Sequence, residues 1–292
     1  MSELFECVLN FSEGQDETLI EEIVDAIKTA AVIDLHSDPD HNRSVVTFIG
    51  SGKETEQGAF NLTERAMQLL DLRGHEGVHP YLGVVDVIPF VPLRGGGMRE
   101  AVGLARNLGE KLWEKLHLPV YFYGEAAIRP ERRELSAVRQ GGYRTLVQES
   151  NLPARRPDCG QGLHPTAGAT AVGARKFLVA FNVNLKSTDV SLAQSIAKNI
   201  REKSGGLPGV RALGVELKSR GLTQVTVNLV DHQQTSLARV YQEIAKWAKE
   251  YEVDIIESEL VGLVPGAAVF PGIKEELCLV NYSDHKILEN YL

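Results

Sequence analysis

One order of elements, strand–helix–strand–strand–helix–strand, is predicted twice along the 292 residues, and it restricts the fold more than any other feature. Runs rich in β-branched and aromatic residues predict the strands, and apolar residues at helical spacing predict the helices. The first copy comprises strands over 5–11, 31–37, 44–50 and 84–91, a helix capped by Asp16 and a helix over 53–70. The second comprises strands over 177–185, 210–217, 224–230 and 253–260, a helix capped by Thr188 and a helix over 236–251.

This order of elements is that of the ferredoxin-like unit. We therefore expect an α/β (α+β) chain of two ferredoxin-like βαββαβ lobes, over 1–174 and 175–292. An extra helix over 98–115, a strand over 120–123 and a segment over 141–173 rich in Gly, Pro and Arg stand between the two copies. Long ordered connections tend to be functional, and a cleft between two lobes is a common ligand site.

Charge and composition argue against several classes of protein. Asp and Glu number 39 against 31 Lys and Arg, so the net charge is −8, and an acidic chain without a basic stripe is unsuited to nucleic acid. The chain contains no run of about 18 apolar residues, so we expect no membrane span. Its first residues lack the basic and apolar regions of a secretory leader, so we expect none. Cys7, Cys159 and Cys278 are far apart, as is typical of reduced thiols in a cytoplasm. Cys7 is expected in the core.

Two clusters of polar residues stand in loops between predicted strands. In the first, His36, Asp38, Asp40 and His41 could ligate a metal, although Asp-Pro and Asp-His-Asn also suit a turn, and no zinc spacing is present. Arg43 would repel a cation and bind a carboxylate, which favours an organic ligand. A local excess of Lys and Arg over 94–156 indicates either a solvated surface or attraction for an anionic small molecule.

The second cluster, over 73–80, places His75 and His79 just before a buried strand. A histidine at a strand entrance could act as a general acid or base, because its unperturbed pKa lies near 6.5; a surface histidine is the alternative. The run over 168–175 imitates a phosphate-binding loop but lacks its Lys and Ser/Thr, so no nucleotide is expected.

A series of stretches, in order across nearly the whole chain, resembles the glutamate formiminotransferase (glutamate formimidoyltransferase) family. They lie over 6–14, 38–43, 77–80, 86–92, 121–127, 168–177, 180–185, 224–229 and 258–265. The resemblance implies transfer of a formimino group from N-formimino-L-glutamate to tetrahydrofolate in histidine breakdown. It also implies two lobes with a ligand tunnel for folate between them, a homodimer, tetrahydrofolate as co-substrate, and no metal.

The resemblance also assigns roles to individual residues. The family's catalytic histidine, a general acid and base, falls on His79. Its folate-binding segment falls on Gly160, Gln161, Gly162, Leu163, His164, Pro165, Thr166, Ala167 and Gly168. Residues expected to line the substrate site are Asn10, Ser12, Glu13, His41, Asn42 and Arg43. Arg43 would hold a glutamate carboxylate, and the arginines over 94–156 would attract the folate glutamyl tail.

Departures from the family pattern keep alternatives open. After His-Pro the family usually has Arg-Met-Gly-Ala, whereas this chain has Tyr81-Leu-Gly-Val, and its C-terminal part looks short. The alternatives are a diverged folate-binding protein, a transferase that uses another donor such as N-formylglutamate, and a metal-dependent hydrolase built on the loop over 36–41. Animal members carry a fused cyclodeaminase domain, which we expect to be absent from a chain that ends at Leu292.

Overall fold

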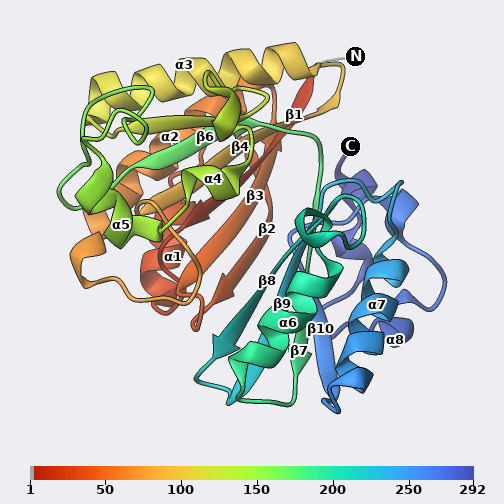
Figure 1. Cartoon of the computed structure of the whole chain (residues 1–292). Coiled ribbons are helices and arrows are strands. Elements are labelled where there is room, and N and C mark those ends of the chain that lie inside the picture. The colour runs from red at the N-terminus through yellow and green to blue at the C-terminus, as the bar shows by residue number, and fades with distance from the viewer. Residues whose placement is uncertain (1–2) are drawn as a thin grey trace. The chain divides into compact units, whose positions relative to one another are not determined.

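The computed structural model describes residues 3–292. Residues 1 and 2, the start of the stretch in which no secretory leader was expected, lie outside the described residues. The chain divides into two compact units, one up to Lys176 and the other Phe177–Leu292 (Figure 1). Each unit contains one β-sheet and its own helices, which confirms the predicted mixed α/β class.

The first unit begins with the predicted six elements and then adds five more. Its strands are β1 (Leu4–Phe11), β2 (Ala31–Asp38), β3 (Arg43–Gly50), β4 (Val85–Arg94), β5 (Val120–Gly124) and β6 (Thr170–Ala174). Its helices are α1 (Glu17–Val24), α2 (Gly52–Leu69), α3 (Met98–Leu116), α4 (Leu135–Val138) and α5 (Gly142–Glu149), with 3-10 turns at Leu72–Gly74 and Pro130–Arg132. Asp16 caps α1 by accepting hydrogen bonds from the backbone N–H groups of Thr18 and Leu19, as predicted.

The sheet of the first unit has the strand order β2-β3-β1-β4-β6-β5. The four strands from β2 to β4 in this order pair antiparallel, whereas β6 pairs parallel to both β4 and β5. The segment over 141–173, which the sequence analysis treated as a connection rich in Gly, Pro and Arg, contains α5 and most of strand β6 of this sheet. Strand β6 escaped prediction because only Thr170 and Val172 of its five residues favour strands, whereas Gly and Ala are depleted in them. Its small, buried side chains suit a position between two strands.

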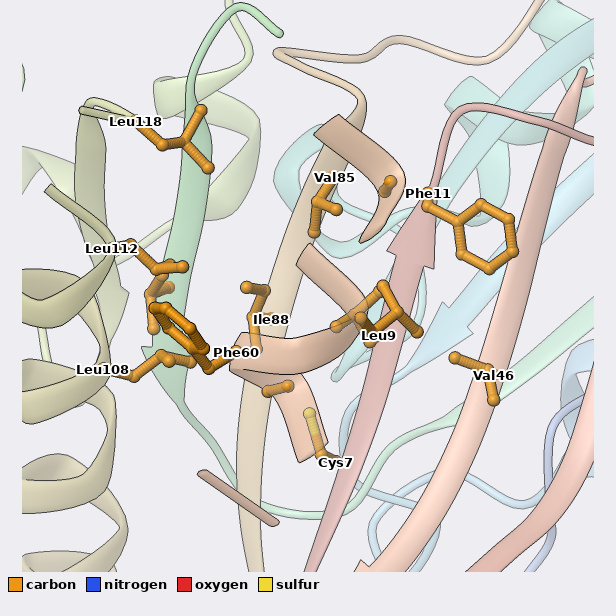
Figure 2. Packing of buried hydrophobic residues seen from close by; sticks show 14 of the residues in the cluster. Cys7, Leu9, Phe11, Val46, Phe60, Val85, Ile88, Leu108, Leu112 and Leu118 are labelled. Atoms are coloured by element: carbon orange, nitrogen blue, oxygen red, sulfur yellow. The ribbon is translucent and has the colours of Figure 1, made fainter. Parts of the chain in front are cut away.

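The main core of the first unit lies on one face of this sheet. Alternate residues of β1, among them Cys7, Leu9 and Phe11, point to this face because successive side chains of a strand alternate. They pack with α1, α2 and α3, and Figure 2 shows Phe60, Leu108 and other residues of the same cluster. Cys7 is 0% exposed, so its prediction as a core residue is confirmed. The opposite face packs Tyr121 and Tyr123 against α4 and α5.

Glu6 lies between two of these core residues and so points to the opposite face of β1. It is 1% exposed, and its Oε2 atom has no hydrogen-bond partner among residues 3–292. Burial raises the pKa of Glu6 to about 7, although the nearby Arg175 cation acts to lower it. The folded protein therefore favours the neutral carboxyl, and an ionised Glu6 opposes folding.

We expect Glu6→Gln to stabilise the protein above pH 7. From the ordinary pKa of 4.5 to the folded value of about 7, the folded state binds more protons than the unfolded state, so wild-type stability falls as pH rises through this range. This shift in the pKa of Glu6 corresponds to a loss of about 3 kcal/mol of unfolding free energy once the pH exceeds the folded value. Urea unfolding at pH 4.5 and 8 measures it, with the exposed Glu21→Gln on α1 as control. An equal effect of Glu6→Gln at both pH values would contradict the expectation.

The second unit repeats the predicted order of six elements. Its strands are β7 (Val179–Leu185), β8 (Val210–Leu217), β9 (Leu222–Leu229) and β10 (Ile255–Val261). Its helices are α6 (Val190–Ile200), α7 (Leu237–Glu250) and α8 (Ile273–Glu276), with 3-10 turns at Glu202–Ser204, Gly266–Ala268, Asp284–Lys286 and Leu288–Tyr291. Asp189, not Thr188 as predicted, caps α6, because its carboxylate accepts from the Ser191 N–H.

The antiparallel sheet of the second unit has the order β10-β7-β9-β8. This is the fourth, first, third and second strand of its βαββαβ run, and β4-β1-β3-β2 in the first unit follows the same order. Helices α6 and α7 pack against this sheet, and Phe181, Ile196 and Val240 belong to the core of the second unit. Over residues 3–292, no helix combines the length and apolar character that a membrane crossing requires.

Candidate functional site

Three loops of the first unit meet at one edge of its sheet. Strand β1 pairs antiparallel with both β3 and β4, so Phe11 lies opposite Ser44 on one side and Val85 on the other. The loop that follows β1, the turn between β2 and β3, and the loop over 75–84 that enters β4 therefore come together. They carry the predicted residues Ser12, Glu13, His41, Asn42 and His79. Arg43 is the first residue of β3, and Asn10 lies within β1.

Asn42 joins these three loops through its side-chain amide. Its Oδ1 accepts a hydrogen bond from the Gly14 N–H at 3.0 Å, and its Nδ2 donates to the Glu76 carbonyl at 2.8 Å. The turn requires φ = 46° at Asn42, a left-handed conformation that asparagine tolerates better than most residues. Gly77 lies so close to this turn that a Cβ atom added to it would stand 2.3 Å from the His41 carbonyl oxygen. The Asn42 side chain thus links the loop after β1 to the loop over 75–84 by hydrogen bonds.

Ser12 and Glu13 also bind the protein's own backbone. The Ser12 hydroxyl donates to the Gly83 carbonyl at 2.8 Å, and the Ser44 hydroxyl donates to the Glu13 carbonyl at 2.6 Å. The Glu13 carboxylate accepts from the N–H groups of Gln15 and Asp16, just before α1. Asn10 donates to the Val8 carbonyl of its own strand at 3.0 Å. These contacts position the loops, and whether any of these residues also touches substrate remains a prediction.

His79 stands at the centre of the site, between Arg43 and His41. Nη1 of Arg43 lies 2.7 Å from Nε2 of His79, and the rings of His41 and His79 stack with centroids 5.8 Å apart. Nδ1 of His79 is buried. His41 is only 2% exposed, so it forms a fixed wall behind the His79 ring.

The environment of His79 disfavours its protonated form. Burial, followed by the positive charges of Arg43 and Arg139 and by His41, holds the pKa of His79 well below its ordinary value of 6.5. The pKa of His79 thus lies below the unperturbed value near 6.5 from which the sequence argument starts. At neutral pH the ring is therefore uncharged.

A buried ion pair supports the loop that carries His79. Asp86, 1% exposed at the start of β4, pairs with Arg139 after α4 and also accepts a hydrogen bond from the Leu82 N–H at 3.0 Å. Sequence reasoning missed this pair. The available signal was a lone carboxylate in an apolar strand, which requires a partner when buried.

Tyr81, the residue that departs from the family pattern, packs among aromatic rings. It meets His75 edge-on with centroids 4.6 Å apart and stacks on Tyr143 of α5 at 5.9 Å. Its hydroxyl donates to the His75 carbonyl at 3.2 Å. Tyr81 thereby ties the loop over 75–84 to α5.

The segment over 160–168 forms a compact turn beside the same loop. His164 and Gly168 exchange both backbone hydrogen bonds, and Nδ1 of His164 accepts from the Ala167 N–H at 3.0 Å. The Val84 N–H donates to the Ala167 carbonyl, and the Ala169 N–H donates to the Leu82 carbonyl. Gly168 has φ = 71°, and an added Cβ there would stand 2.4 Å from the Leu82 oxygen. The structure thus brings the segment predicted to bind folate against the loop that carries His79.

Many of the arginines over 94–156 pair with carboxylates inside the first unit. Arg129 and Arg132 share Asp158, with the shorter N–O distance 2.7 Å. The remaining pairs are Arg133 with Glu125, Arg139 with Asp86, and Arg155 with Glu149. The positive excess that the sequence indicated is thus partly neutralised where it lies, which weakens the argument that this stretch attracts a glutamyl tail.

Asp40 and His41 lie in the turn between β2 and β3, whereas His36 and Asp38 belong to β2. Oδ1 of Asp38 accepts a hydrogen bond from the His41 N–H at 2.8 Å, which closes the turn between β2 and β3.

Comparison with known proteins defines the family. Residues 4–175 match the family model "Formiminotransferase domain, N-terminal subdomain", and residues 180–275 match "Formiminotransferase domain". The chain belongs to the formiminotransferase family. The predicted family and its enzyme class, a transferase, are thereby confirmed.

Curated relatives carry more particular names. A glutamate formimidoyltransferase of Thermoplasma acidophilum is 40% identical over 98% of this chain and 96% of its own length. One of Streptococcus pyogenes serotype M1 is 38% identical over 100% and 99%. The formimidoyltransferase-cyclodeaminase of Rattus norvegicus is 41% identical over 98% of this chain but 56% of its own length. Among solved structures, a microcompartment protein from Desulfitobacterium hafniense DCB aligns with 89% of this chain and 94% of its own length at 9% identity. The TM-score of 0.22 is too low to show a common fold.

Proposed function

We propose that this chain is a glutamate formimidoyltransferase. It transfers the formimino group of N-formimino-L-glutamate to tetrahydrofolate, and the products are 5-formiminotetrahydrofolate and L-glutamate. Near-full-length similarity to enzymes of that name supports the proposal. The observation that carries it is the imidazole of His79, which lies beside the Arg43 guanidinium on a loop that is hydrogen-bonded to the segment over 160–168.

In the proposed reaction, His79 moves one proton. N5 of tetrahydrofolate attacks the formimino carbon, so a C–N5 bond forms and a tetrahedral intermediate results. Neutral His79 accepts the N5 proton and then gives it to the glutamate nitrogen, whose bond to the carbon breaks. A depressed pKa suits this sequence, because the ring is neutral at rest and releases its proton readily once charged.

The neighbouring residues orient the two substrates. Arg43 holds a carboxylate of the donor, since its guanidinium matches a carboxylate in geometry and charge. The segment over 160–168 contacts the folate. The loops held by Asn42 and Ser12 keep these groups in register, and such positioning supplies much of the rate enhancement in two-substrate reactions.

Several wider features belong to the same proposal. The shared order of four strands in each unit supports two ferredoxin-like lobes, which we assign to 1–174 and 175–292. A folate tunnel, a homodimer and a cytoplasmic location remain predictions from the family resemblance.

An assay with three donors tests the function. Purified protein is incubated with tetrahydrofolate and N-formimino-L-glutamate, N-formyl-L-glutamate or L-glutamate alone, and folate product and released glutamate are measured. We expect turnover with the formimino donor and none with L-glutamate alone. Turnover only with the formyl donor would replace the donor, and folate binding without any turnover would replace the transferase by a binding protein.

A further inference from the structure

The contact between Arg43 and His79 fixes the state of the imidazole. A guanidinium stays protonated and can only donate hydrogen bonds. At 2.7 Å, Nη1 of Arg43 therefore donates to Nε2 of His79, so Nε2 accepts and the ring proton lies on Nδ1. Neither nitrogen of the ring is then able to take up a proton, because the Nε2 lone pair is engaged and Nδ1 is already protonated.

From this geometry we infer that Arg43 masks the base His79 in the substrate-free enzyme, and that a carboxylate unmasks it by drawing the guanidinium away. The inference rests on the proposed function and adds a coupling between binding and catalysis. A transferase that is masked in this way holds no active base until an acidic substrate has arrived. It also gives Arg43 a second role, as a positioning residue for the His79 proton.

A carboxylate is the natural competitor for Arg43. A guanidinium–carboxylate pair is charge-assisted and can form two parallel hydrogen bonds, whereas the neutral imidazole offers a single uncharged acceptor. The release moves the Arg43 guanidinium away from Nε2 of His79. His41 stacks on the His79 ring and is buried, so the ring stays in place while the long arginine side chain turns.

The substrates offer two sources of the carboxylate. The donor carries carboxylates on its glutamate moiety, and folate carries them on its glutamyl tail. Both have the same chemistry toward a guanidinium. L-Glutamate represents the first source, tetrahydrofolate the second, and 6-methyltetrahydropterin keeps the reacting ring without any carboxylate.

Nitrogen-15 NMR of the histidine side chains reads the mask directly. The His79 resonances are assigned by their loss in His79→Gln. In the free protein we expect a neutral ring protonated at Nδ1, with the Nε2 signal displaced by its hydrogen bond. Saturating L-glutamate or tetrahydrofolate shifts the Nε2 signal to the position of an unbonded ring nitrogen. Two compounds without a carboxylate, 6-methyltetrahydropterin and the diamide glutaramide, do not shift it.

Variants of Arg43 complete the test. In Arg43→Met the Nε2 signal already stands at the unbonded position and L-glutamate adds no shift, whereas Arg43→Lys retains a donor and part of the displacement. Arg106→Met, at an exposed position of α3, leaves the His79 signals as in wild type. The wild-type spectra alone decide the question if Arg43→Met does not fold.

Three results would overturn the inference: a free protein with the proton on Nε2, an Nε2 signal that neither carboxylate source moves, or an equal shift with 6-methyltetrahydropterin. None of these readings depends on turnover. A protein that transfers formimino groups with an unmasked His79 keeps the proposed function and loses the inference. A masked His79 that responds to carboxylates in a protein without turnover does the reverse.

Discussion

Replacing His79 by alanine lowers formimino transfer by about 10²–10⁴-fold, the usual contribution of one positioned general acid or base. The loss falls on kcat, because both substrates keep their other contacts. Glutamate release under saturating substrates measures it, and circular dichroism verifies the fold. His285→Ala, at an exposed position of the second unit, is the control and keeps wild-type turnover.

The pH dependence of the wild-type enzyme gives the same prediction a second readout. In the proposed reaction, transfer requires neutral His79, and burial together with Arg43 holds the pKa of His79 well below 6.5. Activity is therefore retained as the pH falls through 6.5 and is lost only in more acidic solution. Turnover of His79→Ala within tenfold of wild type would remove His79 as the proton carrier and leave the family assignment untouched.

Replacing Asp86 by alanine costs about 3–5 kcal/mol of unfolding free energy, as expected when one partner of a buried ion pair is removed. The Arg139 guanidinium, 15% exposed, then loses its counter-charge, and the Leu82 N–H loses its acceptor. Urea unfolding measures the loss. For comparison, Glu22 pairs with Arg65 at the surface, and Glu22→Ala costs at most about 1 kcal/mol.

The double variant Asp86→Leu/Arg139→Met separates the charge from the pair. Removing both charges avoids an uncompensated buried cation, so the double variant is more stable than Asp86→Ala. Its turnover stays low because Leu82, three residues after His79, is no longer held. If Asp86→Ala were no more costly than Glu22→Ala, Asp86 and Arg139 would not be a supporting element of the site.

The elements that could be predicted from the sequence are those with strong local signals. The long helices α2 and α3 begin and end within one residue of their predicted bounds, because apolar periodicity over four or more turns leaves little freedom. Strand β6 has no such signal. Its small residues are explained only by the two strands that flank it, and those come from much earlier in the chain.

The candidate site was predictable in its membership more than in its chemistry. Motif matching found His79, Arg43 and the segment over 160–168, and the structure brings all three to one set of loops. It did not indicate that Asn42 binds backbone groups on two other loops, or that Asp86 pairs with a residue 53 positions away. Such contacts depend on tertiary packing, and so does the depressed pKa of His79.

The position of β6 in the first sheet has a consequence for synthesis on the ribosome. Strand β4 is made early, but its outer neighbour emerges only after α3, β5, α4 and α5. Until then the nascent chain exposes an unpaired strand edge, the kind of surface on which chains associate wrongly. The turn over 160–168 is made just before β6 and joins the loop over 75–84 when that strand docks. Completion of the sheet and completion of the site thus depend on the same segment, and we expect a stalled chain that ends before β6 to be inactive and prone to aggregate.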